Sequence, residues 1–319
     1  MSSNPARSYA PEIVVAAGCL IALITFGPRA SAGLFQIPMT VQFHWGRDTF
    51  SLALAIQNLL WGLGAPFAGA IADRYGTVRV LCVGALLYAA GLVTMAYATS
   101  PLQLHLGAGV LIGFGLSACS FNLVLAAFGK LLPEQWRPMA FGAGTAAGSF
   151  GQFLFPPIGN ILIDTLGWQQ ALVVFAFTLL PILPISIVMA TRKTGAAAGA
   201  AAPNLPNQTI VQALGEAFKH RSYVLLVLGF FTCGFQLAFI TVHMPAYLKD
   251  AGLPAWVGGW TLAVIGLANA VGSLSSGWLS TRMPKRHLLA WIYLGRAVAI
   301  AAFILIPASP LTALTFGVV

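Results

Sequence analysis

The feature that most constrains this chain is a run of fifty residues, Val80 to Gly129, that contains no Asp, Glu, Lys or Arg. A helix needs about 20 mostly apolar residues to cross a bilayer, so the run is long enough for two crossings. Only 7% of the 319 residues are charged and 58% are hydrophobic, whereas soluble domains carry about 25% charged residues. This composition excludes a water-soluble globule and predicts an all-α polytopic membrane protein.

Charge-free windows of this kind predict nine complete spans and the start of a tenth. They cover about residues 13–39, 49–72, two spans within 80–129, then 138–163, 168–191, 222–248, 256–281, 287–306 and the start at 310–319. Thr99-Ser100-Pro101 marks the turn between the third and fourth spans, and Asp164 with Gly167 marks the turn between the fifth and sixth. Pro156-Pro157 predicts a break inside the fifth span.

A polar stretch separates the sixth span from the seventh. Residues 192–208 are rich in Gly, Ala and Pro, which predicts a flexible linker, and a short amphipathic helix on the membrane surface follows from Ile210. The expected organisation is therefore a six-helix half at 1–191, a linker at 192–220 and an incomplete second half at 221–319. Because the tenth span is only begun, we expect a chain truncated at its C-terminal side.

The basic residues set the expected orientation. Of sixteen Lys and Arg residues, twelve lie at one set of predicted helix ends, and only Arg47 and Lys249 lie at the opposite ends. Cytoplasmic loops are enriched in Lys and Arg, so the N-terminus and the linker are expected to be cytoplasmic. The net charge of +9 is then a topology signal and not a nucleic-acid surface. The expected location is a plasma membrane, the inner membrane of a bacterium.

The loop after the second predicted span carries a recognisable motif. It reads Gly69-Ala70-Ile71-Ala72-Asp73-Arg74-Tyr75-Gly76-Thr77-Val78-Arg79 and resembles the loop signature of the major facilitator superfamily, G-x-L-x-D-R-x-G-R-R. A degraded copy begins at Gly277, 208 residues later, as two homologous halves predict. The resemblance implies two six-helix halves and a cytoplasmic gating latch. Its residues would be Gly69, Asp73, Arg74, Gly76 and Arg79.

Asp73 is expected to face a helix N-terminus or an Arg. The alternative is a basic turn that serves membrane topology only.

A second motif lies in the first span. The segment from Gly27 to Phe35, with Pro28 before Arg29, resembles the monocarboxylate transporter branch of the superfamily, in its bacterial type. That branch has an Asp and an Arg in the eighth helix, and this chain has Asn269 and Ser273 at those positions. The resemblance implies secondary active transport of a small organic anion, a monocarboxylate, by rocking of the two halves about a central site.

Two arginines inside spans are the main candidate substrate-binding residues. A charge at mid-membrane costs at least about 2.5 to 3.5 kcal/mol, so Arg29 and Arg296 should each face a cavity or a partner. The planar guanidinium of Arg29 matches a carboxylate, but backbone carbonyls of neighbouring helices are an alternative partner. Arg296 has no acidic residue within the complete spans except Glu12 and Asp164 near span ends. A structural role and a substrate role are both open for it.

Several uncharged polar residues accompany the arginines. The amides expected to line the cavity, or to bond to a neighbouring helix, are Gln57, Asn58, Asn122 and Gln152, and Asn269 is a further candidate substrate-binding residue. His243 is a candidate proton relay, and an interfacial or packed histidine is the alternative. The four cysteines lie inside apolar runs, and we expect no metal and no cofactor.

Together with the intramembrane arginines, the resemblance implies a secondary transporter of a small organic anion, with a co-transported or exchanged ion and the lipid bilayer as further partners and no nucleic acid. An exporter of drugs or metabolites with a structural Arg29 is the nearest alternative. A membrane sensor without flux is another. A membrane-embedded enzyme would need a nucleophile and base or a metal set at membrane depth, and the sequence offers neither, so no enzyme is expected.

Overall fold

The structure, a computed structural model, describes residues 9–190, 210–279 and 282–318. Within these ranges every regular element is a helix, in agreement with the predicted all-α class. The elements that precede the predicted linker are α1 (Pro11–Ala30), η1 (Ala32–Phe35), α2 (Gln36–Phe43), α3 (Arg47–Tyr75), α4 (Thr77–Ala96), α5 (Pro101–Leu104), η2 (His105–Leu111), α6 (Ile112–Cys119), α7 (Phe121–Leu131), η3 (Glu134–Trp136), α8 (Arg137–Leu166), α9 (Trp168–Leu179), α10 (Ile182–Ile185) and η4 (Ser186–Met189).

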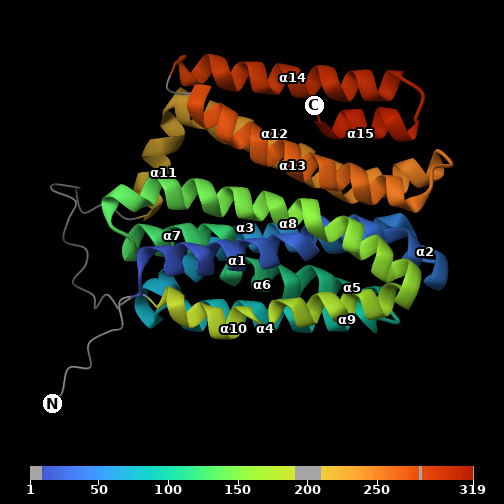
Figure 1. Cartoon of the computed structure of the whole chain (residues 1–319), viewed down its shortest axis with the longest axis horizontal. Coiled ribbons are helices and arrows are strands. Elements are labelled where there is room, and N and C mark those ends of the chain that lie inside the picture. Colours follow the sequence, from blue (N-terminus) through green and yellow to red (C-terminus); the bar gives the residue numbers. More distant parts are fainter. Residues whose placement is uncertain (1–8, 191–209, 280–281, 319) are drawn as a thin grey trace.

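The second group of helices follows residues 191–209, which include the predicted linker and lie outside the described residues. Its members are α11 (Ile210–Lys219), α12 (Arg221–Asp250), α13 (Ala255–Leu279), α14 (Lys285–Leu305) and α15 (Pro310–Val318). A helix at the predicted amphipathic segment is therefore confirmed as α11. Figure 1 shows the long helices running roughly along one axis, with α11 near one end of the bundle and α2 at the other. These are called the α11 end and the α2 end below.

Turn chemistry sets several helix boundaries where the sequence predicts them. Ser100 caps the helix that follows, because its hydroxyl accepts a hydrogen bond from the Gln103 amide at 3.4 Å. Gly167 ends α8 with a φ of 86°, and Gly76 joins α3 to α4 with a φ of 93°. Both glycines adopt backbone angles that other residues rarely take.

Eight helical stretches in the described residues are long and apolar enough to cross a membrane, judged by length and composition. Three of them combine consecutive helical segments, namely Pro11–Phe43, Pro101–Leu131 and Trp168–Met189. The predicted fifth span corresponds to α8, which is 30 residues long but rich in Gly and polar residues. The count of nine spans therefore stays a prediction.

The expected break at Pro156-Pro157 is wrong. Helix α8 continues from Arg137 to Leu166 through both prolines. A proline removes one backbone donor, and packing against neighbouring helices compensates for that loss inside a membrane bundle. Phe155 packs in this region against Phe175 of α9, with ring centroids 5.5 Å apart.

One large cluster of buried apolar side chains fills the space among the helices from α1 to η4. Its largest fully buried members include Tyr88, Phe35, Phe50, Phe128 and Phe175. A much smaller cluster joins α12, α13 and α15. Helix α12 exposes a row of large side chains such as Phe230, Phe231 and Phe235. Lipid tails are as apolar as these groups, so such exposure is compatible with a membrane-spanning helix.

The two groups of helices meet closely near the α2 end. A Cβ atom on Gly33 of η1 would strike the carbonyl oxygen of Thr241 and lie 2.7 Å from that of Val242, so only glycine allows this crossing with α12. The side chain of Asn160 on α8 donates to the carbonyl of Ala255 at 3.1 Å, at the start of α13. Towards the α11 end, α12 and α13 diverge from α8 (Figure 1).

Candidate anion-binding site

The site begins with an interruption of the first span. Pro28 has no N–H to offer the carbonyl of Ile24, and α1 ends two residues later. Ser31 then donates its backbone N–H and its hydroxyl to the Gly27 carbonyl, at 3.3 and 3.2 Å, and the chain continues as the short 3₁₀-helix η1. Interrupted membrane helices expose backbone polar groups, and transporters place ligands at such points.

Arg29 lies at this interruption and is held by α3. Its Nη2 donates to Oδ1 of Asn58 at 2.9 Å, and its guanidinium carbon lies 4.5 Å from the ring centroid of Trp61. Asn58 is itself oriented, because its amide nitrogen donates to the Leu54 carbonyl at 2.8 Å. The Nε atom of Arg29 is buried and has no hydrogen-bond partner in the described structure. Asn58 and Trp61 therefore hold one side of the guanidinium in place, and the Nε–H donor is unused.

A small cavity of about 20 Å³ adjoins Arg29. Its polar lining comes from Arg29, Gln57 and Tyr88, and the rest of the lining is mainly apolar. Gln57 donates to the Ala108 carbonyl at 2.8 Å, which ties α3 to η2. A volume of this size holds about one water molecule, so this conformation leaves no room for an organic anion there.

No carboxylate neutralises either intramembrane arginine in the described structure. The two ion pairs found among the described residues join Arg47 to Asp250 and Lys130 to Asp73. The hydrogen-bond partner of Arg29 is a neutral amide, and that of Arg296 is the Cys233 thiol at 3.2 Å. An uncompensated guanidinium at membrane depth is costly and is an anion-binding group by its chemistry.

Arg296 borders a second and larger cavity, of about 740 Å³, among α12, α13, α14 and α15. The structure brings Arg296, Asn269 and Ser273 to this one cavity, and Gln236 joins them from α12. The Oε1 atom of Gln236 has no hydrogen-bond partner in the described structure. Arg29 is not among the lining residues, so the two predicted arginines lie in different cavities.

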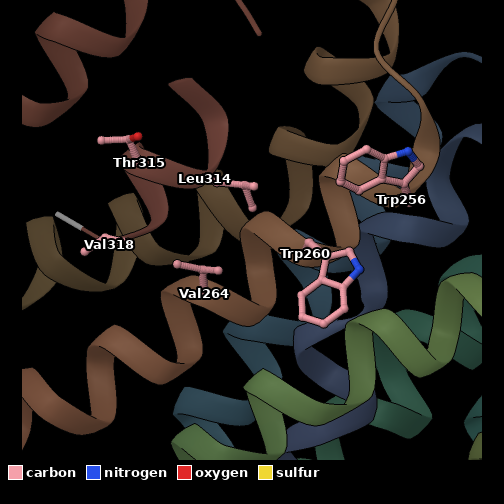
Figure 2. Close-up of a pocket in the computed structure, with 6 residues that line it drawn as sticks. All are labelled: Trp256, Trp260, Val264, Leu314, Thr315 and Val318. Carbon is pink, nitrogen blue, oxygen red and sulfur yellow. The ribbon is translucent and has the colours of Figure 1, made fainter. Parts of the chain in front are cut away.

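A third hollow, of about 440 Å³, lies between α13 and α15 and is drawn in Figure 2. Trp256, Trp260 and Val264 line it from α13, opposite Leu314 and Thr315 of α15 (Figure 2). No charged side chain lines this hollow. Its described lining residues therefore offer an anion no opposite charge.

The other predicted site residues are spread through the bundle. Gln152 is 3% exposed on α8, and Asn122 is exposed at the start of α7. His243 is partly buried on α12, with its ring 4.8 Å from that of Phe239. Of the predicted amides, Asn58 alone has a hydrogen bond to Arg29 in the described structure.

The motif predicted to act in gating spans the turn between α3 and α4. Asp73 pairs with Lys130 at the end of α7, and both side chains are largely exposed. This partner differs from the expected helix N-terminus or Arg, because the turn brings Asp73 beside α7. Arg74 lies over the ring of Tyr75, with its guanidinium carbon 5.4 Å from the centroid, and Arg79 is exposed. A Cβ on Gly69 would meet open space, so the described structure does not require glycine there.

Three polar features were not predicted from the sequence. Gln36 is fully buried at the start of α2, and neither its amide nitrogen nor its oxygen has a partner in the described structure. Asn160 joins α8 to α13 through the Ala255 carbonyl. The third feature is the Arg47–Asp250 pair. Polar residues inside apolar runs are the signal that could have identified Gln36 and Asn160 as candidates.

An all-helical chain with long apolar helices and two part-buried arginines among them is a polytopic membrane protein. The chain belongs to the Major Facilitator Superfamily, whose sequence profile matches residues 17–319.

Curated relatives of the chain include monocarboxylate transporters. The chain is 29% identical over 284 residues to Monocarboxylate transporter 11 of Mus musculus, covering 87% of this chain and 61% of the relative. It is 26% identical over 267 residues to the uncharacterized MFS-type transporter YcxA of Bacillus subtilis, covering 82% of this chain and 63% of the relative. This chain thus spans about three fifths of the length of these relatives.

Solved structures with the same fold include transporters. A D-xylose-proton symporter matches with a TM-score of 0.68 at 14% identity, covering 97% of this chain and 77% of the other. A bacterial homologue of the human lysosomal transporter Spinster, in an inward-facing and occupied conformation, matches with a TM-score of 0.71 at 18% identity. That match covers 99% of this chain and 71% of the other. At this identity the likeness concerns the fold alone.

Proposed function

We propose that the protein is a secondary active transporter that carries a small organic anion, a monocarboxylate, across the plasma membrane of a bacterium. The observation that carries this proposal is Arg29, which lies where the first span is interrupted and has no acidic partner in the described structure. The names of the monocarboxylate transporter relatives support the same class of substrate.

Electrostatics explains why an anion suits this position. A guanidinium within the bilayer core is stabilised when a carboxylate supplies the opposite charge and two parallel acceptors. Asn58 and Trp61 hold one side of the guanidinium, and the buried Nε has unused donor capacity. Because the adjacent cavity holds about one water molecule, the substrate would enter in a different arrangement of the helices.

The proposed transport cycle is alternating access. Residues 1–191 and 221–319 would form two halves that rock about a central site, joined by a cytoplasmic linker at 192–220. Asn122 and Gln152 would line the path. On the second half, Arg296 and Asn269 would form a further polar surface, and His243 would relay a proton if the coupled ion is H⁺.

The second candidate is an exporter of drugs or metabolites in which Arg29 is structural. It is supported by the contacts that Arg29 already makes with Asn58 and Trp61, and by the small size of the adjacent cavity. In that case selectivity would come from aromatic surfaces, such as the hollow beside Trp256 and Trp260.

Uptake by the purified full chain in liposomes tests the proposal. Acetate, lactate and pyruvate would each be compared with the neutral amide of the same shape, with and without a proton gradient. Saturable uptake of the carboxylates, with the amides excluded, is the expected result. Uptake of an apolar dye without carboxylate uptake would contradict the proposal and favour the exporter. Absence of any flux would contradict both and favour a sensor.

A further inference from the structure

An ion pair joins two helices that are far apart in the sequence. Arg47 is the first residue of α3 and Asp250 is the last residue of α12. The two nitrogens Nη1 and Nη2 of Arg47 donate to Oδ2 and Oδ1 of Asp250 at 2.5 and 2.7 Å. Two parallel bonds of this kind give an arginine–carboxylate pair a defined geometry.

The pair lies at the α2 end, beside the two other close contacts between the helix groups. There α12 packs on η1 at Gly33, and Asn160 bonds to Ala255. The ion pair near the α11 end, Asp73 with Lys130, joins α3 to α7 and so stays within the first helix group. Of the two ion pairs in the described structure, only Arg47–Asp250 therefore links the two groups.

Exposure makes the pair breakable. Both side chains are 50% exposed, so water can solvate each charge as soon as the two helices separate. A buried pair would impose a large penalty for separation, whereas an exposed pair contributes modestly to whichever arrangement contains it. Such a contact suits an equilibrium between arrangements in which the two helix groups are together and apart at this end.

We propose that Arg47 and Asp250 form a latch that closes the α2 end of the transporter and sets the fraction of molecules closed at that end. The latch rests on the proposed alternating access but is independent of the substrate and of Arg29. Gly33 provides the close helix crossing beneath it, and the ion pair tunes how often that crossing opens. If the linker is cytoplasmic, the latch faces the outside of the cell.

Labelling of a cysteine placed under the latch tests this proposal. Thr241 is 7% exposed beside the large cavity, and its carbonyl is next to Gly33, so Thr241→Cys should react with a maleimide faster when α12 leaves η1 than in the closed arrangement. The full chain in lipid nanodiscs would be labelled, and peptide mass spectrometry would read position 241, so the native cysteines can remain. In the regime of rapid opening and closing, the labelling rate reports the open fraction.

Loss of either charge should increase the labelling rate. For an exposed pair, Arg47→Gln or Asp250→Asn should each raise the rate about two- to five-fold, and the double variant should be no faster than the faster single one. The exchanged pair, Arg47→Asp with Asp250→Arg, should return the rate towards that of the Thr241→Cys parent. The matched control Asp48→Asn removes a neighbouring charge and should leave the rate unchanged.

Two results would overturn the latch. One is an unchanged rate in both single variants, and the other is an exchanged pair that labels as fast as the singles. Because labelling needs no flux, this test is separate from the proposed function. A rate that follows the ion pair in a protein with no carboxylate uptake would support the latch and contradict the proposed function.

Discussion

Replacing Arg29 separates a substrate-binding role from a structural one. Arg29→Gln removes the charge and the fork, whereas Arg29→Lys keeps the charge and loses the two parallel donors. If the guanidinium binds a carboxylate, Gln loses a charge-assisted contact of about 1.5 to 3 kcal/mol. The dissociation constant should then rise about ten- to a hundred-fold, and Lys should fall between Gln and the unmodified protein.

The structure also gives the expected effect on folding. Gln gives up the hydrogen bond to Asn58, worth about 1.5 to 3 kcal/mol, and the contact with Trp61, worth about 0.5 to 2 kcal/mol. It also removes a charge whose burial in the membrane costs about 2.5 to 3.5 kcal/mol. These contributions are of similar size and opposite sign. The thermal stability of Arg29→Gln should therefore stay close to that of the unmodified protein.

The assay measures binding and stability on the same sample. A panel of small carboxylates would be titrated into purified full-chain protein by calorimetry, and thermal unfolding would be followed in parallel. Asn58→Leu is the matched control, because it keeps the charge of Arg29 and removes its orienting partner. It should weaken binding less than Arg29→Gln does. Equal carboxylate affinity in the unmodified protein and in Arg29→Gln would refute the site, and lower folded yield in both Arg29 variants would indicate a structural arginine.

Two further changes probe the predicted gating motif around Asp73 and the packing between helices. Asp73→Asn should strongly reduce transport in liposomes while membrane insertion and folded yield remain normal, because an exposed pair with Lys130 adds only about 0 to 1 kcal/mol of stability. Normal flux at normal expression would leave the motif with a topological role only. Gly151→Val should lower the unfolding temperature, because a Cβ there would strike the Leu23 carbonyl of α1 and overpacking costs about 1 to 3 kcal/mol or more. Gly142→Ala, where a Cβ meets open space, is the control, and an equal loss in both variants would contradict the packing argument.

The helix pattern was predictable because it depends mainly on residues that are close together in the sequence. Charge-free runs locate the long helices, and Ser100 and Gly167 mark turns through their own chemistry. The uninterrupted α8 was missed because local proline propensity was overridden by packing on neighbouring helices. At Pro28, by contrast, the first helix ends within two residues.

The partners of the polar residues were not predictable in the same way. Arg29 and Asn58 could each be identified as a polar residue in a span, but their pairing depends on how α1 lies on α3. Asp250 is 203 residues from Arg47, and each one alone is an ordinary charge at a helix end. Such long-range pairs follow from tertiary packing, which one sequence does not specify.

The buried amide of Gln36 gives the closed α2 end an internal source of instability. An amide with neither atom hydrogen-bonded costs about 1 to 3 kcal/mol for each unsatisfied group, and Gln36 directly follows η1, on which α12 packs. If separation of α12 from η1 lets water reach this amide, the cost is relieved. In the alternating access proposed above, this amide would oppose closure of the α2 end, while the Arg47–Asp250 pair would favour it.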